Sequence, residues 1–208
     1  MMKRLIAIIL FIYCNCTYIV AQSVIEIEAI QEISRVAASI KTLKCDFVQT
    51  KTLKMLGDKM ISKGLMYCSQ PNHLRWEYVS PYTYTFILNE NQVLLKKGNR
   101  NDIIDVNQNK MFKEIAHIMM NSVLGNCLTD KKDFKVGLSS QDNYYIVTLN
   151  PQKKEIKQTF TKIVLHYNRD SSMIVKVDMY EKNGDSTTIE LMNIQMNNPI
   201  DASVYEIH

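Results

Sequence analysis

Residues 47–88 decide the fold of this 208-residue chain and read FVQTKTLKMLGDKMISKGLMYCSQPNHLRWEYVSPYTYTFIL. In the segments LRWEY (74–78) and YTFIL (84–88) every second residue is apolar. Side chains on a β-strand point alternately to opposite faces, so this period of two predicts strands with one apolar face. Pro71 and Pro81 interrupt the run and are typical of turns. The stretch therefore predicts neighbouring strands of one sheet that share an apolar side.

The same period recurs along most of the chain. Turn signals at 97–99 (KGN) and 182–185 (KNGD) separate apolar runs, and the Asn-Gly pair of the second is typical of a tight hairpin. The alternation predicts strands over residues 43–52, 60–68, 73–79, 82–88, 93–97, 103–106, 134–138, 144–149, 160–167, 173–180 and 186–196. This order predicts an antiparallel meander of about ten or eleven strands.

Two segments have a helical period instead. In residues 24–40 and 110–124 apolar residues recur every three or four positions, and glutamates near the start of the first segment favour a helix N-terminus. The two apolar stripes include Ile33, Ala37 and Ile40, and Ile115, Ile118 and Met119, respectively. A long sheet curls as it twists, and both helices need a surface to cover. The predicted fold is all-β with capping helices, an open and curved antiparallel β-barrel that does not close.

The N-terminus predicts export. Lys3 and Arg4 precede an apolar run that ends near Ala21, which is the layout of a secretory signal peptide over residues 1–21. A lipid-anchored start at Cys14 or Cys16 is the alternative, but Tyr13 and Asn15 precede these cysteines where a small residue is expected. Residues 22–208 contain no linker or repeat, so they are expected to form a single domain with a sizeable core. We therefore expect an exported, soluble protein.

Composition and motifs argue against several classes of function. Removing the leader takes away two of 25 basic residues and none of the 21 acidic ones, which leaves a small positive charge without a basic block. Nucleic-acid binding is therefore not expected. The four histidines are dispersed and lack the spacing of metal ligands, and no phosphate loop or nucleophile elbow is present. We expect no metal, no cofactor and no catalytic residue.

The order and spacing of the strand and turn motifs in residues 47–88 resemble the periplasmic carriers of outer-membrane lipoproteins, the LolA-like family. The resemblance extends over nearly all of residues 22–208 and includes Gly184-Asp185 and the closing segment 199–201 (PID). It implies a helical lid over an apolar cavity in the half-barrel. The pattern of residues alone is equally compatible with a filled core.

With this resemblance, alternation indicates which residues line the cavity. The candidate lipid-binding residues are Phe47, Leu74, Trp76, Tyr78, Tyr84, Phe86, Leu88, Leu95, Ile115, Ile118 and Met119. The candidate lid residues are Gln70, Ile33, Ala37 and Ile40. The family commonly has Arg before the Pro of the third strand, where it can bind lid carbonyls. This chain has Gln70, which donates fewer hydrogen bonds and has no charge.

The resemblance implies a periplasmic carrier that binds the acyl chains of lipoproteins and ferries them from the inner to the outer membrane. Its implied partners are acylated lipoproteins, an inner-membrane ATP-driven lipoprotein-release complex and an outer-membrane acceptor, and the carrier is expected to be a monomer. A carrier of another lipid, such as a glycolipid or phospholipid, is one alternative. A lipoprotein-sensing regulatory domain is a second alternative, and an enzyme on the same scaffold is a third.

Three cysteines lie outside the leader, namely Cys45, Cys68 and Cys127. An odd and small number argues against a disulfide framework. A hairpin turning near residues 56–57 would place Cys45 opposite Cys68, where an oxidising compartment permits a bond. Two small buried thiols are the alternative.

Overall fold

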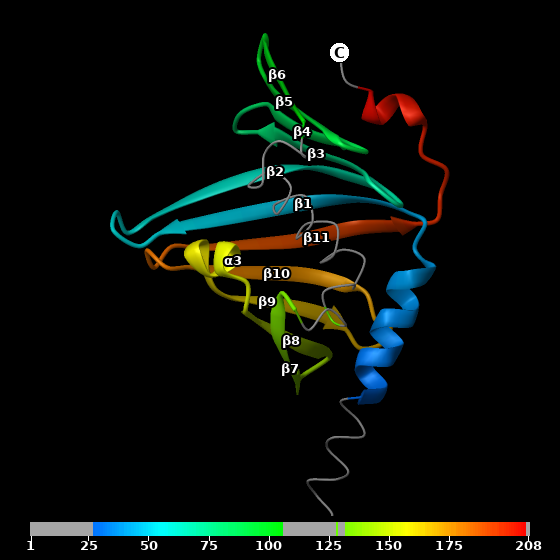
Figure 1. Cartoon of the computed structure of the whole chain (residues 1–208), viewed down its shortest axis with the longest axis vertical. Coiled ribbons are helices and arrows are strands. Elements are labelled where there is room, and N and C mark those ends of the chain that lie inside the picture. The colour runs from blue at the N-terminus through cyan, green and yellow to red at the C-terminus, as the bar shows by residue number, and fades with distance from the viewer. Residues whose placement is uncertain (1–26, 106–127, 129–131, 207–208) are drawn as a thin grey trace, which may run out of the picture.

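The computed structural model describes residues 27–105, 128 and 132–206. In these residues eleven strands form one antiparallel sheet (Figure 1). The first six are β1 (Thr42–Leu53), β2 (Asp58–Ser69), β3 (His73–Ser80), β4 (Tyr84–Asn89), β5 (Gln92–Lys97) and β6 (Arg100–Asp105). The others are β7 (Phe134–Gln141), β8 (Tyr144–Pro151), β9 (Phe160–Asn168), β10 (Ile174–Glu181) and β11 (Ser186–Met196). A helix over residues 27–39 precedes β1, α3 (Lys154–Thr159) follows β8, and the 3₁₀ helix η2 (Ala202–Tyr205) follows β11.

The strand order is β6-β5-β4-β3-β2-β1-β11-β10-β9-β8-β7. Strands that follow one another in sequence therefore pair, except β6 and β7, and the first and last strands meet at the centre of the sheet. In the part of the chain that the structure describes, β6 and β7 are the two edges and do not pair with each other. The prediction of an unclosed antiparallel sheet of ten or eleven strands is confirmed.

One face of the sheet contains the main core. In β1 the side chains of Leu43, Cys45 and Phe47 are buried while Lys44 between them is exposed, as a period of two requires. Helix 27–39 and α3 cover this face, because residues from both belong to the same buried cluster as the β1 side chains. We call this the covered face. Figure 1 shows the two helices on the same side of the sheet.

A smaller apolar cluster lies on the opposite face. Tyr205 of η2 packs there with Ile87 of β4 and Leu94 of β5. The Tyr205 hydroxyl lies 2.8 Å from the Ser69 hydroxyl, and Asn89 donates a hydrogen bond to the Tyr205 carbonyl. The C-terminal segment is therefore fastened against the outside of β2 to β5 (Figure 1). This packing explains why β4 is buried on both faces.

Several expectations differ from the structure or lie outside it. The segment that forms α3 was not predicted as a helix, because six residues with a single buried apolar side chain, Ile156, show no periodicity. The predicted leader 1–21 and the whole of the predicted helix 110–124 lie outside the described residues. No helix among the described residues is long and apolar enough to span a membrane.

Candidate functional site

The covered face brings together most of the predicted lipid-binding residues. Five are buried in one cluster, with exposed fractions of 7% or less: Phe47, Leu74, Trp76, Phe86 and Leu88. Three others are partly buried and pack against this cluster, namely Tyr78, Tyr84 and Leu95. Ile115, Ile118 and Met119 lie outside the described residues.

Strand register explains why these side chains meet. Trp76 of β3 lies opposite Met66 of β2 and Phe86 of β4, and Phe86 in turn lies opposite Leu95 of β5. Directly opposed residues share a face, so the four side chains form a row across four strands. A second row runs parallel to the first through Cys68, Leu74, Leu88 and Val93. The two rows give this half of the sheet a continuous apolar surface.

Aromatic rings are concentrated at one end of this surface. The ring of Phe47 lies 4.3 Å from that of Trp76 and 5.3 Å from that of Tyr78, centroid to centroid. Tyr84 adds a fourth ring, 6.1 Å from Tyr78. Burial raises the pKa of both Tyr78 and Tyr84, so neither phenol ionises near neutral pH. The indole nitrogen of Trp76 is buried and makes no hydrogen bond of standard geometry. Its interaction with the Tyr78 hydroxyl opposes part of the rise in the pKa of Tyr78.

The second half of the sheet extends the same surface, and the predicted site omitted it. Six aliphatic side chains of β8, β9 and β11 belong to the same cluster: Val147, Leu149, Ile163, Leu165, Ile189 and Leu191. Their alternation was visible in the sequence and predicted the strands. These side chains share a face with Trp76 because β1 pairs with β11, and no local pattern in the sequence specifies that pairing.

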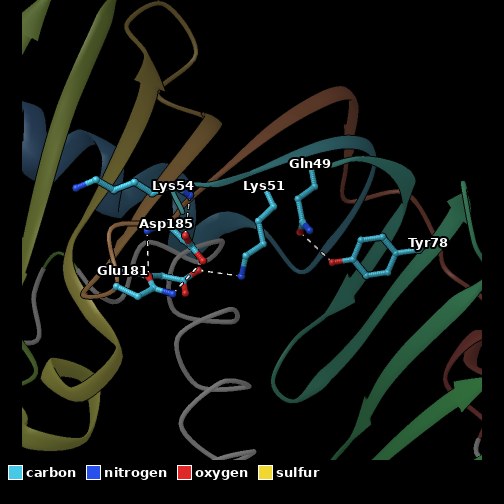
Figure 2. A network of polar contacts seen from close by, with 7 residues as sticks. Gln49, Lys51, Lys54, Tyr78, Glu181 and Asp185 are labelled. Carbon is cyan, nitrogen blue, oxygen red and sulfur yellow. Dashed lines mark hydrogen bonds and ion pairs between the residues drawn. The ribbon is translucent and has the colours of Figure 1, made fainter. Parts of the chain in front are cut away.

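Polar side chains continue the covered face beyond its aromatic end. Gln49 and Lys51 continue the inward-facing series of β1 beyond Phe47. The Tyr78 hydroxyl donates to Gln49 Oε1 at 2.9 Å, and Lys51 Nζ lies 3.2 Å from Glu181 Oε1 (Figure 2). The apolar surface is therefore bounded along β1 by hydrogen bonds and an ion pair.

The predicted lid residues fall into two groups. Ile33, Ala37 and Ile40 are buried, with exposed fractions of 0%, 5% and 1%. Gln70 donates from Nε2 to the Ile40 carbonyl at 2.6 Å, and its backbone N–H donates to the Lys41 carbonyl. Gln70 thus occupies the position that the resemblance implied for Arg and makes a hydrogen bond to a carbonyl at the C-terminal end of helix 27–39.

The two described cysteines are adjacent but not opposed. The register pairs Cys45 with Met66 and Cys68 with Leu43, so the prediction that they face each other is wrong by two residues. The hairpin turns one residue earlier than the sequence suggested. Both side chains are buried thiols that no disulfide joins. Burial raises the pKa of each thiol to about 12, which makes both poor nucleophiles. Cys127 lies outside the described residues.

The polar groups outside the covered face have a different chemistry from that face. In residues 27–105, 128 and 132–206 no group of three or more His, Cys, Asp or Glu is placed to hold a metal ion. A hollow of about 520 Å³ lies on the outer face beside a bulge between β1 and β11. Its lining includes Lys44, Asp46, Asn193 and Gln195, so it differs in chemistry from the covered face.

Comparison with known proteins agrees with this architecture. The model of the family described as outer membrane lipoprotein carrier protein LolA matches residues 38–208. An outer-membrane lipoprotein carrier protein of Nitrosospira multiformis is 22% identical over 171 residues, which cover 80% of this chain and 77% of the relative.

Two solved structures share the fold. A DUF1329 family protein from Desulfovibrio piger aligns with a TM-score of 0.52 at 11% identity, over 86% of this chain and 95% of its own. An uncharacterised conserved protein from Thermus thermophilus also has a TM-score of 0.52 at 11% identity, over 85% of this chain and 92% of its own. At such identities the likeness concerns the fold alone. Because the family match spans both halves of the sheet and the helix end that Gln70 fastens, the chain belongs to the LolA family of outer-membrane lipoprotein carrier proteins.

Proposed function

We propose that this protein is a periplasmic carrier that binds the acyl chains of lipoproteins and ferries them from the inner to the outer membrane. The observation that supports this proposal best is the continuous apolar surface built from the rows through Trp76 and Leu74. The family assignment supports the same cargo, since its members are carriers rather than enzymes. The chain would act as a monomer after loss of the leader 1–21.

The physical need for such a surface is large. Each CH₂ group that leaves water contributes about 0.8 kcal/mol, and a lipoprotein has several acyl chains. A carrier must bind these chains firmly and still release them. Aliphatic and methionine side chains on a broad sheet adapt to flexible chains better than a tightly shaped pocket does.

The described residues suggest a division of roles. The acyl chains would lie against Phe47, Leu74, Trp76, Phe86 and Leu88, with Tyr78, Tyr84 and Leu95 at the margin. Helix 27–39 would act as the lid, opening by loss of the Gln70 hydrogen bond to Ile40 and by movement of Ile33 and Ala37. Ile115, Ile118 and Met119 would complete the lining. An inner-membrane ATP-driven release complex would load the carrier, and an outer-membrane acceptor would unload it.

Mass spectrometry of the protein purified from its native periplasm tests the cargo. We expect acylated lipoproteins to co-purify. Recovery of a single free phospholipid or glycolipid would contradict the lipoprotein proposal and favour a carrier of that lipid.

Substitutions test the site. Phe86→Glu and Leu74→Glu would each place an unpaired charge on the covered face, at a cost of several kcal/mol to ligand binding. Ile87→Glu is the matched control, because Ile87 is the next residue of β4 and is equally buried on the opposite face. We expect the first two variants to lose co-purifying cargo and the Ile87 variant to keep it, with circular dichroism used to select folded protein. Equal loss in all three folded variants would argue that these positions are ordinary core.

A further inference from the structure

The turn of the β1–β2 hairpin exposes large apolar side chains to solvent. Met55 is 93% exposed and Leu56 is 75% exposed, more than any other large apolar residue that the structure describes. Met60 and Ile61 follow in β2, with exposed fractions of 47% and 55%. Soluble proteins rarely gather exposed apolar groups in this way unless they bind something there. We call residues 55–61 the hairpin tip.

The hairpin tip projects beyond the strand beside it. Pairing of β1 with β2 continues to Leu53 and Asp58, whereas pairing of β2 with β3 ends at Lys63. Met60 and Ile61 are successive residues of a strand, so their side chains point to opposite faces of this free end. Figure 1 shows the turn between β1 and β2 at one extremity of the sheet. The tip is therefore apolar on both sides, unlike a sheet face that covers a core.

Polar contacts hold the base of the tip in place. The Lys54 backbone N–H donates to Asp185 Oδ1 at 2.9 Å, which links the hairpin to the β10–β11 turn. The ion pair between Lys51 and Glu181, described above, joins β1 to the end of β10 (Figure 2). The turn is closed by a hydrogen bond from Leu56 N–H to the Leu53 carbonyl. A fixed tip loses little conformational entropy on binding.

Exposed lysines flank the apolar side chains in the sequence of the hairpin. Lys54, Lys59 and Lys63 are exposed in residues 54–63, a segment in which Asp58 is the one acidic residue, and Asp185 of the β10–β11 turn lies at its base. A lysine can lay its aliphatic stem along an apolar surface and keep its ammonium group at the level of lipid phosphates. An apolar tip with exposed lysines beside it is complementary to the surface of an anionic bilayer.

We propose that the hairpin tip docks this protein on anionic phospholipid membranes, with Met55 and Leu56 entering the acyl region and the lysines contacting the headgroups. A protein partner fits less well, because a stable protein interface buries about 800 Å² on each partner, more than one hairpin turn offers. This inference does not depend on the cargo, since membrane docking is measured with the protein alone.

Vesicle flotation tests the docking. The protein is mixed with vesicles of phosphatidylethanolamine and phosphatidylglycerol, or of phosphatidylcholine alone, and the bound fraction is measured. We expect binding to the anionic vesicles that weakens as salt rises. Met55→Ser combined with Leu56→Ser should lower the partition coefficient roughly tenfold. Lys54→Gln and Lys59→Gln should each lower it about fivefold, and only on anionic vesicles.

A matched double variant controls for the loss of exposed apolar groups. Val79→Ser combined with Ile103→Ser removes two residues that are 50% and 57% exposed elsewhere on the sheet, and it should bind vesicles like the unchanged protein. Depth is tested with Leu56→Trp in a Trp76→Phe background, where lipids brominated in the acyl chain should quench the new indole. Absence of binding, or equal binding by both double variants, would overturn the proposal. Self-association that depends on Met55 and Leu56 would overturn it in favour of a second copy of the chain.

Discussion

Gly64 illustrates how one residue adapts the sheet to its aromatic cluster. A Cβ atom at this position would lie 2.5 Å from Cζ of the Phe47 ring and would clash with the Glu77 carbonyl oxygen. The register of β2 against β3 also shifts here, between Lys63 and Gly64. The missing side chain allows the Phe47 ring to fold over β2 and to meet Trp76. Glycine in a strand often marks such a close approach.

Gly64→Ala should therefore destabilise the protein. Both neighbours are rigid, an aromatic ring and a strand carbonyl, so we expect a loss of about 1–3 kcal/mol or more in the free energy of unfolding by urea. Gly137→Ala is the control, because its Cβ would meet its nearest neighbour, the Thr148 carbonyl, at 4.0 Å. That variant should be neutral or slightly stabilised. Equal effects of the two substitutions would refute the role given to Gly64.

Among the elements, helix 27–39 is held both by packing and by side-chain hydrogen bonds at its C-terminal end, where Asn197 Nδ2 donates to the Ser39 carbonyl at 3.2 Å. Ile33 and Ile40 anchor it in the core, while Gln70 binds the Ile40 carbonyl from the start of the neighbouring hairpin turn. Burial of the apolar stripe contributes more free energy than a neutral hydrogen bond, which is worth about 1 kcal/mol. A bond of this strength would break readily if the helix moved as the proposed lid requires.

Gln70→Ala should loosen this end of the helix without unfolding the sheet. Hydrogen exchange measured by mass spectrometry should show faster exchange in peptides from residues 27–41, by about fivefold for a loss of 1 kcal/mol. Gln92→Ala, at the exposed start of β5, is the control and should leave that exchange unchanged. Gln70→Arg should slow the exchange and prolong retention of bound lipid, because guanidinium offers more donors. Unchanged exchange in Gln70→Ala would show that packing and the Asn197 hydrogen bond to Ser39 hold the helix without Gln70.

Over the whole molecule, a polar cluster joins three strands on the outer face. Asp178 of β10 accepts hydrogen bonds from Thr188 of β11 at 2.6 Å and from His166 of β9 at 2.8 Å, and Lys176 lies 3.2 Å away. Burial by itself raises the pKa of Asp178, but the hydrogen bonds from Thr188 and His166 and the charge of Lys176 outweigh it, so the pKa lies below its ordinary value.

This lowered pKa links stability to pH. A carboxyl group with a depressed pKa stabilises the folded state at pH values above its unfolded pKa and loses that contribution as the pH falls through the folded pKa. Asp178→Asn should therefore cost about 1–3 kcal/mol in unfolding free energy at neutral pH, and the difference should shrink below about pH 4. Asp170→Asn, in an exposed turn, should change stability by less than about 0.5 kcal/mol. A difference for Asp178→Asn that does not vary with pH would contradict this account.

Much of the architecture was determined by local sequence. The period of two predicted each described strand to within a few residues, because alternate burial depends only on neighbours in the chain. The KNGD signal gave the β10–β11 turn, where Gly184 has a positive φ of 88°. The same alternation placed Leu74, Trp76, Phe86 and Leu88 on one face, which the structure confirms.

Tertiary structure decided what depends on distant partners. Pairing of β1 with β11 brought Leu165 and Leu191 onto the face of Trp76, and no local period specifies which strands far apart in sequence will pair. The register that separates Cys45 from Cys68 depended on the length of one turn, because a shift of the turn moves every pair along the hairpin. The short helix α3 is stabilised by the packing of Ile156 in the core. Alternation and periodicity are properties of the chain, whereas register, long-range pairing and short packed helices are set by the fold as a whole.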